Sequence, residues 1–178
     1  MRKLPVTELN RASVAEFKAQ SKTPIVLVLD NVRSALNVGS AFRTADAFAI
    51  KRIYLCGITA QPPNKEITKT AIGATESVDW EYHKDIIEAA TLLKAQGYQL
   101  VAIEQAEGSV ALQDYIIPEA GKIALVFGNE VTGVSDAVMD IADTAIEIPQ
   151  FGTKHSLNIS VCVGIVIWEL FSKLKFRS

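Results

Sequence analysis

The stretch IVLVLDNVRSALNVGSAFRTADAFAIKRIYLC, residues 25–56, contains the pattern that decides the fold. Ile25–Leu29 is a short, continuous and mostly β-branched run, which is typical of a strand that helices cover on both faces. A polar loop, DNVRSALNVGS, leads from it to a predicted helix, AFRTADAFA, and then to a second strand at Arg52–Cys56. Strand, helix and strand in succession indicate a parallel sheet.

The same alternation continues to the end of the chain. Further elements are predicted as a helix at Asp85–Gln96, which Gly97 ends, and strands at Tyr98–Ile103, Lys122–Phe127 and Thr144–Ile148. A closing helix from about Asn158 to Lys173 is apolar nearly all round and is therefore expected to be buried. The sequence predicts an α/β fold, with a mostly parallel sheet covered by helices.

The N-terminal residues form a separate predicted segment. Ser13-Val-Ala-Glu16 has the pattern of a capping box that opens a short helix, which ends before Pro24. We therefore expect residues 1–22 to be an extension with one short helix. Residues 23–178 are expected to form a single globular domain, without repeats or an internal boundary.

The composition predicts a folded protein rather than a disordered one. The 178 residues are 49% hydrophobic and 21% charged. The N-terminus carries no apolar run behind its basic residues, and the most apolar stretch, Val161–Leu170, is too short to span a bilayer. A soluble, cytoplasmic protein is expected.

The cysteines and histidines give no indication of a metal site. Cys56 and Cys162 lie far apart in apolar surroundings, and the chain contains only two histidines, His83 and His155. These residues do not supply a zinc-ligand set, so two buried thiols and no bound metal are predicted.

The charges are unevenly distributed, although the net charge is only −2. Residues 31–75 contain six bases and two acids, whereas residues 76–120 contain nine acids and two bases. This asymmetry permits one basic face on an acidic protein, as attraction to nucleic-acid phosphates requires. A solvated surface of mixed charge would give the same pattern, so both interpretations stay open.

Candidate ligand loops follow the carboxyl ends of the predicted strands, where ligands bind in parallel sheets. They are Asp30–Asn37, Glu104–Gly108, Gly128–Ser135 and Pro149–Leu157. The common nucleotide motifs are absent, because no strand precedes a GxGxxG pattern and the Gly128–Gly133 loop lacks the lysine of a P-loop. Ser156 beside His155 lacks the nucleophile elbow of a hydrolase.

Three separated segments together resemble the SpoU/TrmH branch of the SPOUT RNA methyltransferases, over residues 23–170. The family's N-x-x-x-x-x-R motif matches Asn37 and Arg43. Its G-x-E-x-x-G loop matches FGNEVTGVS at residues 127–135, and its S-L-N motif, preceded by I-P, matches residues 148–158. Three motifs in family order are far more specific than any one of them alone.

The resemblance implies a deep trefoil knot in the C-terminal third, and a pocket for S-adenosyl-L-methionine (SAM) formed by the knot loops. The implied cofactor contacts are Glu104, Gln105, Val126, Phe127, Gly128, Asn129, Glu130, Ile148, Gln150, Ser156 and Leu157. Gly128, Gly133 and Gly152 fit a backbone that approaches a ligand closely, or simply a turn.

The resemblance also implies catalytic roles for Arg43, Asn37, Glu130, Ser156 and Asn158. The family has been assigned an arginine base at the position of Arg43, but a guanidinium is always protonated in proteins. We therefore expect Arg43 to hold the target phosphate and to lower the pKa of the ribose hydroxyl through its positive charge. The alternative is a surface ion pair with Asp46, three residues further along a helix.

Each of the other catalytic candidates also has a purely structural interpretation. Asn37 is expected to orient the ribose or Arg43, but asparagine is also a common helix N-cap. Glu130 is expected to fix Arg43 or Asn37, or else to be a helix-start carboxylate near Ser135. Ser156 and Asn158 are expected to open the last helix, where they either cap it or present polar groups to the ribose or the SAM carboxylate.

RNA contacts are expected from Arg33, Arg43, Lys65, Lys69, Thr70 and Lys154. Residues 65–70 otherwise fit a solvated helix face. The family acts as a homodimer that shares residues between sites, and the apolar last helix fits either a subunit interface or simple core burial.

Three functions remain to be compared. We favour SAM-dependent 2′-O-methylation of a ribose in RNA, with a tRNA guanosine preferred over rRNA because of the residues around Gln150 and Trp168 and the short N-terminal extension. A base methyltransferase of the same superfamily would be expected to use an acidic base and other motifs. An RNA-binding module without activity would not need the glycine-rich pocket.

Overall fold

The computed structural model describes residues 1–176, and within them seven strands form one parallel sheet in the order β3-β2-β1-β6-β4-β7-β5. The strands are β1 (Thr23–Asp30), β2 (Ile50–Cys56), β3 (Trp80–His83), β4 (Gln99–Ile103), β5 (Val110–Ala111), β6 (Ile123–Phe127) and β7 (Thr144–Glu147). The order places β1, β6 and β4 in the interior of the sheet, so their carboxyl ends meet at one edge. The predicted α/β class is confirmed.

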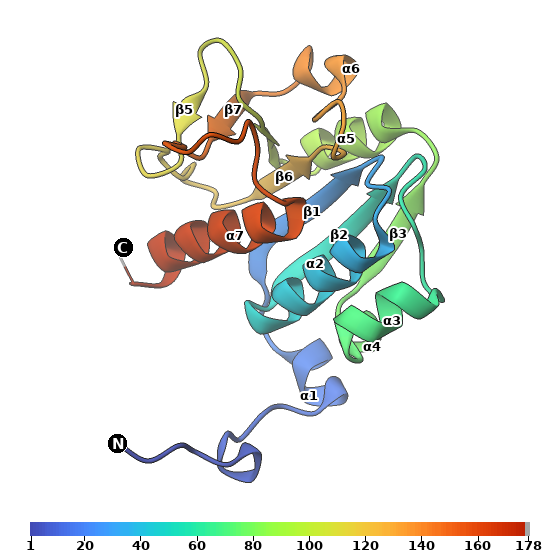
Figure 1. Cartoon of the computed structure of the whole chain (residues 1–178), viewed down its shortest axis with the longest axis vertical. Helices are drawn as coiled ribbons and strands as arrows, with labels where there is room; N and C mark the ends of the chain where they lie inside the picture. Colours follow the sequence, from blue (N-terminus) through green and yellow to red (C-terminus); the bar gives the residue numbers. More distant parts are fainter. Residues whose placement is uncertain (177–178) are drawn as a thin grey trace.

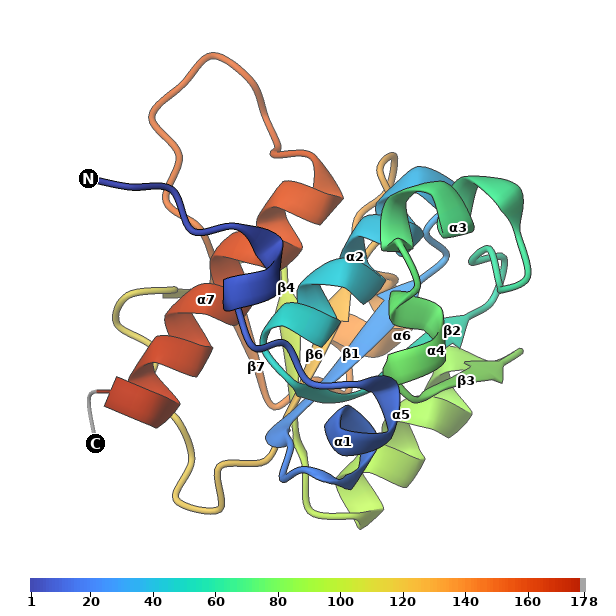
Figure 2. The same cartoon turned by 90° about the horizontal axis from the view of Figure 1, so that it is seen from below.

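Helices cover both faces of the sheet. One face carries α2 (Ala35–Ala47), α3 (Lys65–Ala71), α4 (Ala74–Ser77) and α7 (Ile159–Phe176), and the other carries α5 (Ile86–Ala95) and α6 (Asp136–Met139). Figure 1 shows α2 and α7 side by side across the front of the sheet, and Figure 2 shows the same pair from below. Asn37 and Arg43 lie on α2, and the S-L-N motif immediately precedes α7, so the packing of these two helices brings the two motifs close together.

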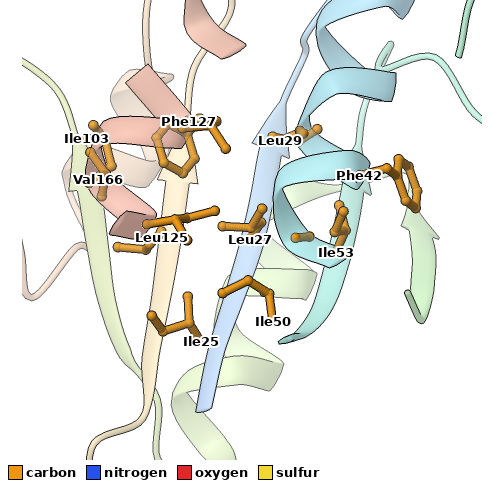
Figure 3. Close-up of a cluster of buried hydrophobic side chains, with 14 of the residues drawn as sticks. Ile25, Leu27, Leu29, Phe42, Ile50, Ile53, Ile103, Leu125, Phe127 and Val166 are labelled. Atoms are coloured by element: carbon orange, nitrogen blue, oxygen red, sulfur yellow. The ribbon is translucent and has the colours of Figure 1, made fainter. Parts of the chain in front are cut away.

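Alternating side chains of the central strands supply two separate cores. Ile25, Leu27 and Leu29 of β1 point towards α2 and α7 (Figure 3), whereas Val26 and Val28 pack in the cluster that contains residues of α5 and α6. All five side chains are at most 2% exposed, as expected for a strand that is covered on both faces.

The start of α2 differs from the prediction, which placed a loop as far as Ser40. The helix begins at Ala35, because Ser34 caps it and accepts a hydrogen bond from the backbone nitrogen of Asn37 at 3.3 Å. Gly39 lies inside the helix, where an added Cβ would overlap Thr70 and the Ile67 carbonyl of α3. Gly39, which the prediction placed in a loop, therefore permits the close packing of two helices.

The last helix is correctly placed but is not buried all round. Val161, Ile165, Trp168 and Phe176 of α7 are 50%, 39%, 52% and 68% exposed, and they form an apolar stripe on its outer side. The prediction of complete burial was wrong, because α7 packs against the sheet and α2 by one side only. Among the described residues, no helix is both long and apolar enough to cross a membrane.

The N-terminal segment extends away from the body of the protein (Figure 1). It contains η1 (Val6–Glu8) and α1 (Val14–Ala19), and the predicted capping box is present between Ser13 and Glu16. Phe17 of α1 is buried, and α1 contacts α4. The last two residues of the expected domain, 177 and 178, lie outside the described residues.

Candidate functional site

A cavity of about 620 Å³ lies beyond the carboxyl ends of β4, β6 and β7, between their loops and the start of α7. It is lined by ten residues that the resemblance implied as cofactor contacts: Glu104, Gln105, Phe127, Gly128, Asn129, Glu130, Ile148, Gln150, Ser156 and Leu157. Three loops that are separate in the sequence thus form one wall. Its size is within the range of pockets for small molecules and cofactors.

Val126 lies apart from the other expected contacts. Its side chain is fully buried in the core cluster beneath α5 and α6, whereas the next residue, Phe127, faces the opposite cluster and lines the cavity. The alternation of side chains along β6 explains the difference. The side chain of Val126 therefore does not line the cavity.

Cys162 also lines the cavity, although the sequence analysis treated it only as a buried thiol. Burial, with a smaller contribution from the negative charge of Glu104, raises the pKa of Cys162 to about 12. The thiol is therefore neutral at physiological pH and is a poor nucleophile. Cys162 lies four residues, or about one helical turn, after Asn158. This spacing in the sequence could have placed Cys162 at the site.

The loop after β6 is a closed turn that glycines make possible. The backbones of Asn129 and Gly133 exchange two hydrogen bonds of 3.1 Å, and within this turn Asn129 Oδ1 accepts hydrogen bonds from the backbone nitrogens of Val131 and Thr132. A Cβ on Gly128 would overlap the backbone of Gly133 and Val134, and Gly133 has φ +70°. Gly152, by contrast, has open space around it, so nothing in its surroundings requires a glycine.

Hydrogen bonds join the three motifs at the edge of the cavity. The amide nitrogen of Asn37 donates to Glu130 Oε1 at 2.9 Å, and the amide oxygen of Asn37 accepts a bond from Asn158 Nδ2 at 3.3 Å. Asn37 is not the N-cap of α2, since Ser34 occupies that position. The side chain of Asn37 is therefore available to link two loops, and each partner fixes the orientation of its amide.

Glu130 is held in its charged form. Burial alone would raise its pKa, but hydrogen bonds from Asn37 and from the backbone N–H groups of Glu130, Arg33 and Ser34 outweigh burial and lower the pKa below its ordinary value. A carboxylate with a lowered pKa is a weak base. Glu130 is therefore better suited to orienting Asn37 than to accepting a proton from a substrate.

Ser156 and Asn158 differ in their surroundings. Asn158 immediately precedes α7, and its side-chain oxygen accepts a hydrogen bond from the backbone nitrogen of Ser160 at 2.9 Å. It therefore stabilises the helix start while its amide nitrogen contacts Asn37. Ser156 lies in the loop before the helix, exposed and on the cavity wall.

Arg43 lies outside the cofactor cavity, in a second hollow of about 450 Å³ between α2 and α3. The hollow is lined by Ser40, Arg43, Thr44, Ala47, Phe48, Lys69 and Thr70. Within residues 1–176, Arg43 forms no ion pair with Asp46, whose carboxylate accepts a hydrogen bond from Ser77 Oγ at 2.5 Å. Two cations thus line a hollow without an acidic residue.

The other expected RNA contacts lie at the surface. Arg33, Lys65 and Lys154 are exposed, but they do not line the hollow of Arg43. The hydroxyl of Thr70 is engaged in the α2–α3 contact, because it donates to the carbonyl oxygen of Leu36 at 3.0 Å. Lys69 is therefore the residue of α3 best placed to act with Arg43.

Comparison with known families identifies the fold. Residues 24–168 match the model of the SpoU rRNA Methylase family, which covers most of the chain and all three motifs. The chain belongs to the SpoU rRNA Methylase family. It is 32% identical over 162 residues to the 23S rRNA (guanosine-2′-O-)-methyltransferase RlmB of Vibrio parahaemolyticus, over 91% of the chain and 64% of the relative. It therefore spans less than two thirds of that relative's length.

This SpoU family chain is also similar to a tRNA enzyme. It is 30% identical over 165 residues to the tRNA (guanosine(18)-2′-O)-methyltransferase of Thermus thermophilus, over 92% of the chain and 82% of the relative. The relatives at this level of identity are thus divided between two kinds of RNA.

Solved structures share the fold of this SpoU family chain. The TrmH/SpoU tRNA modifying enzyme of A. aeolicus superposes with a TM-score of 0.81 at 27% identity, over 92% of the chain and 82% of the neighbour. An AdoMet-bound rRNA methyltransferase from Sinorhizobium meliloti has a TM-score of 0.79 at 28% identity, over 89% and 59%. These likenesses imply the trefoil knot in the C-terminal part.

Proposed function

We propose that the chain is a SAM-dependent methyltransferase that modifies a ribose 2′-hydroxyl in RNA, with a tRNA guanosine as the target. The observation that carries the proposal is the Glu130–Asn37–Asn158 chain of hydrogen bonds, which joins the three family motifs beside the cavity. The preference for tRNA rests on the Thermus thermophilus relative, of which the chain covers 82%, compared with 64% of the Vibrio parahaemolyticus rRNA enzyme.

The cavity fits SAM in chemistry as well as in size. Phe127, Ile148 and Leu157 offer apolar surfaces for an adenine ring, and Gln105 and Gln150 offer amides for its polar groups. The turn from Asn129 to Gly133, which two backbone hydrogen bonds close, lines one side of the cavity. When bound, SAM supplies an activated methyl group, so the protein has to align the ribose, exclude water and ease loss of the hydroxyl proton.

Arg43 supplies the positive charge for that last task. Its guanidinium stays protonated, so it stabilises negative charge on the 2′-oxygen instead of accepting the proton. Its planar fork can hold a neighbouring phosphate through two hydrogen bonds, with Lys69 in the same hollow. Asn37, held by Glu130 and Asn158, orients the ribose next to the cofactor cavity.

A second copy of the chain completes this proposed site. Arg43 lines a hollow separate from the cofactor cavity, and the exposed stripe of α7 is apolar enough to lie in an interface. We propose a homodimer in which Arg43 of one protomer faces the cavity of its partner. Replacing Trp168 by Glu should yield monomers that bind SAM but transfer no methyl group. Elution of the wild type as an active monomer at micromolar concentration would refute the dimer.

The function is tested by locating the transferred methyl group. The purified protein is incubated with labelled SAM and with bulk tRNA or rRNA, and the digested nucleosides are analysed by mass spectrometry. We expect 2′-O-methylguanosine from tRNA. The same nucleoside from rRNA would replace tRNA by rRNA as the target, and a base-methylated nucleoside would contradict ribose methylation. SAM binding without transfer to either RNA would contradict the activity on these substrates.

A further inference from the structure

Asp30 is a buried carboxylate whose contacts reach from β1 to the loop of Glu130. It ends β1, and its relative exposure is 0%. Its Oδ2 accepts a hydrogen bond of 2.8 Å from the backbone nitrogen of Ser135, and its Oδ1 accepts one of 2.8 Å from Asn31 Nδ2. A charge so deeply buried is costly unless its oxygens are well satisfied, so its position requires an explanation.

The contact between the two loops is reciprocal. Asp30 belongs to the segment that leads into α2, and it binds the backbone at the end of the loop after β6. Glu130 belongs to that loop, and its Oε1 accepts a hydrogen bond of 2.9 Å from the amide nitrogen of Asn37 in the first turn of α2. Each segment thus provides one carboxylate to N–H groups of the other, which fixes both as one unit.

A third carboxylate holds the same loop from the other side. Glu104, at the end of β4, accepts a hydrogen bond of 3.0 Å from the backbone nitrogen of Val134, and its second oxygen accepts one from its neighbour Gln105. Consecutive backbone N–H groups of Val134 and Ser135 are therefore held by carboxylates from two different strands. Glu104 lines the cavity, whereas Asp30 does not.

We propose that Asp30 is a positioning residue for methyl transfer, which acts by holding the loop after β6 so that Glu130 can orient Asn37. Asp30 does not line the cavity, so it contacts neither cofactor nor ribose. The inference rests on the proposed function, because it takes the Glu130–Asn37 pair as part of the active site. It assigns a role to a residue that none of the three motifs contains.

The neighbouring Asn31 provides a sharp test, because the two side chains can be exchanged. In Asp30→Asn an amide nitrogen would face the donor Asn31 Nδ2, and in Asn31→Asp two carboxylates would face each other. In the double variant, Asn at 30 still accepts from Ser135 and donates to Asp at 31, which still accepts from the Ile58 nitrogen. Asn31 has φ 54°, which aspartate also tolerates.

The wild type, the two single variants and the double variant are compared by three measurements. Hydrogen exchange of the Ser135 amide, followed by NMR, reports the clamp, by which we mean the hydrogen bond from Ser135 to Asp30. Calorimetry with S-adenosylhomocysteine, the product that remains when SAM has lost its methyl group, reports binding in the cavity. Steady-state kinetics separates kcat from the KM for RNA. We expect Asp30→Asn to expose the Ser135 amide and to weaken S-adenosylhomocysteine binding and kcat roughly tenfold each, with little change in KM. The double variant should return close to the wild type in all three.

Tyr115→Phe serves as a matched control for a general loss of stability. The Tyr115 hydroxyl donates to Gln99 Oε1 at 2.6 Å, at the other end of β4 from the cavity. This variant also loses one hydrogen bond of a buried side chain, but it should bind S-adenosylhomocysteine and turn over as the wild type does.

Two results would overturn the proposal. One is a folded Asp30→Asn that keeps both the protected Ser135 amide and the wild-type kcat. The other is a folded double variant that fails to recover kcat. If the single variants do not fold, the kcat of the double variant still shows whether exchanging the two side chains restores turnover. Amide exchange and S-adenosylhomocysteine affinity need no RNA, so a clamp that behaves as expected without any methyl transfer would count against the proposed function alone.

Discussion

The two hollows beside α2 differ in how completely one chain builds them. Three loops form the cofactor cavity, and the hydrogen bonds of Glu130 and Asn158 with Asn37 fasten two of them to α2. The hollow of Arg43 and Lys69 is bounded by α2 and α3 alone, and both cations are exposed. Residues of α2 line the second hollow, whereas α2 is joined to the first through the hydrogen bonds of Asn37 with Glu130 and Asn158.

This difference indicates how the two sites work. A cofactor of fixed shape benefits from a pre-formed cavity, because little ordering has to occur on binding. An RNA backbone arrives with its own charge and shape, and exposed cations on a helix can adjust to it. Changes in the cofactor cavity should therefore act on SAM affinity, and changes in the open hollow should act on RNA and on turnover.

Arg43→Ala is expected to give the largest difference between the effect on turnover and the effect on SAM affinity. Loss of the guanidinium removes the charge that we propose stabilises the reacting 2′-oxygen, so kcat should fall on the order of 10²- to 10³-fold. SAM affinity, measured by calorimetry, should stay within about twofold, because Arg43 does not line the cavity. Arg43→Lys keeps the charge but loses the fork, and should recover only part of kcat. Full turnover by Arg43→Ala would contradict the assignment.

The opposite pattern is expected from Gly128→Ala. The added methyl group would overlap the backbone of Gly133 and Val134, so the closed turn has to shift. SAM should bind about 5- to 150-fold more weakly, because overpacking of this kind costs about 1–3 kcal/mol. Gly152→Ala is the matched control, since its surroundings are open, and it should bind SAM as the wild type does. Equal effects at both glycines would show that the turn is not fixed by packing.

Most residues that line the cofactor cavity could be predicted from the sequence and the family resemblance. Ten of the eleven expected contacts line one cavity, because the residues that follow parallel strands meet at one edge of the sheet. Val126 does not line the cavity for a local reason, since a residue inside a strand alternates with its neighbour and its side chain faces the other core. A run of consecutive residues taken from a family motif does not say which side chains point to which face of the sheet.

The remaining features depend on contacts between distant residues, which no local pattern shows. Gly39 was placed in a loop, but it lies inside α2, where its lack of a side chain permits the contact between α2 and α3. Asp30 looked like the first residue of a polar loop, and only the fold brings it to Ser135, 105 residues away. The composition of α7 could not show which of its residues are exposed and which belong to the core, since both sets are apolar.

A smaller effect is expected from Lys69→Ala in the open hollow. Removal of one phosphate-directed cation should raise the KM for RNA a few-fold and reduce the slope of log affinity against log salt by about one. SAM affinity should not change. Lys51→Ala is a suitable control, because Lys51 is equally exposed but lies on β2, outside the hollow. A loss at Lys51 as large as that at Lys69 would indicate diffuse attraction instead of a defined contact.

The smallest effect is expected in the acid stability at the cofactor cavity. The pKa of Glu130 is lowered in the folded protein from its ordinary value of 4.5, so the unfolded chain binds this proton more readily. The stability that the charged carboxylate contributes is therefore present above pH 4.5 and is lost as the pH falls through the folded pKa. Glu130→Gln has no proton to bind, so the difference between its urea midpoint and that of the wild type should be constant above pH 5 and shrink towards pH 3. Other carboxylates titrate in both proteins and cancel in this difference. A difference that stays constant down to pH 3 would mean that Asn37 and the backbone N–H groups at the start of α2 bind the neutral side chain as well as the charged one.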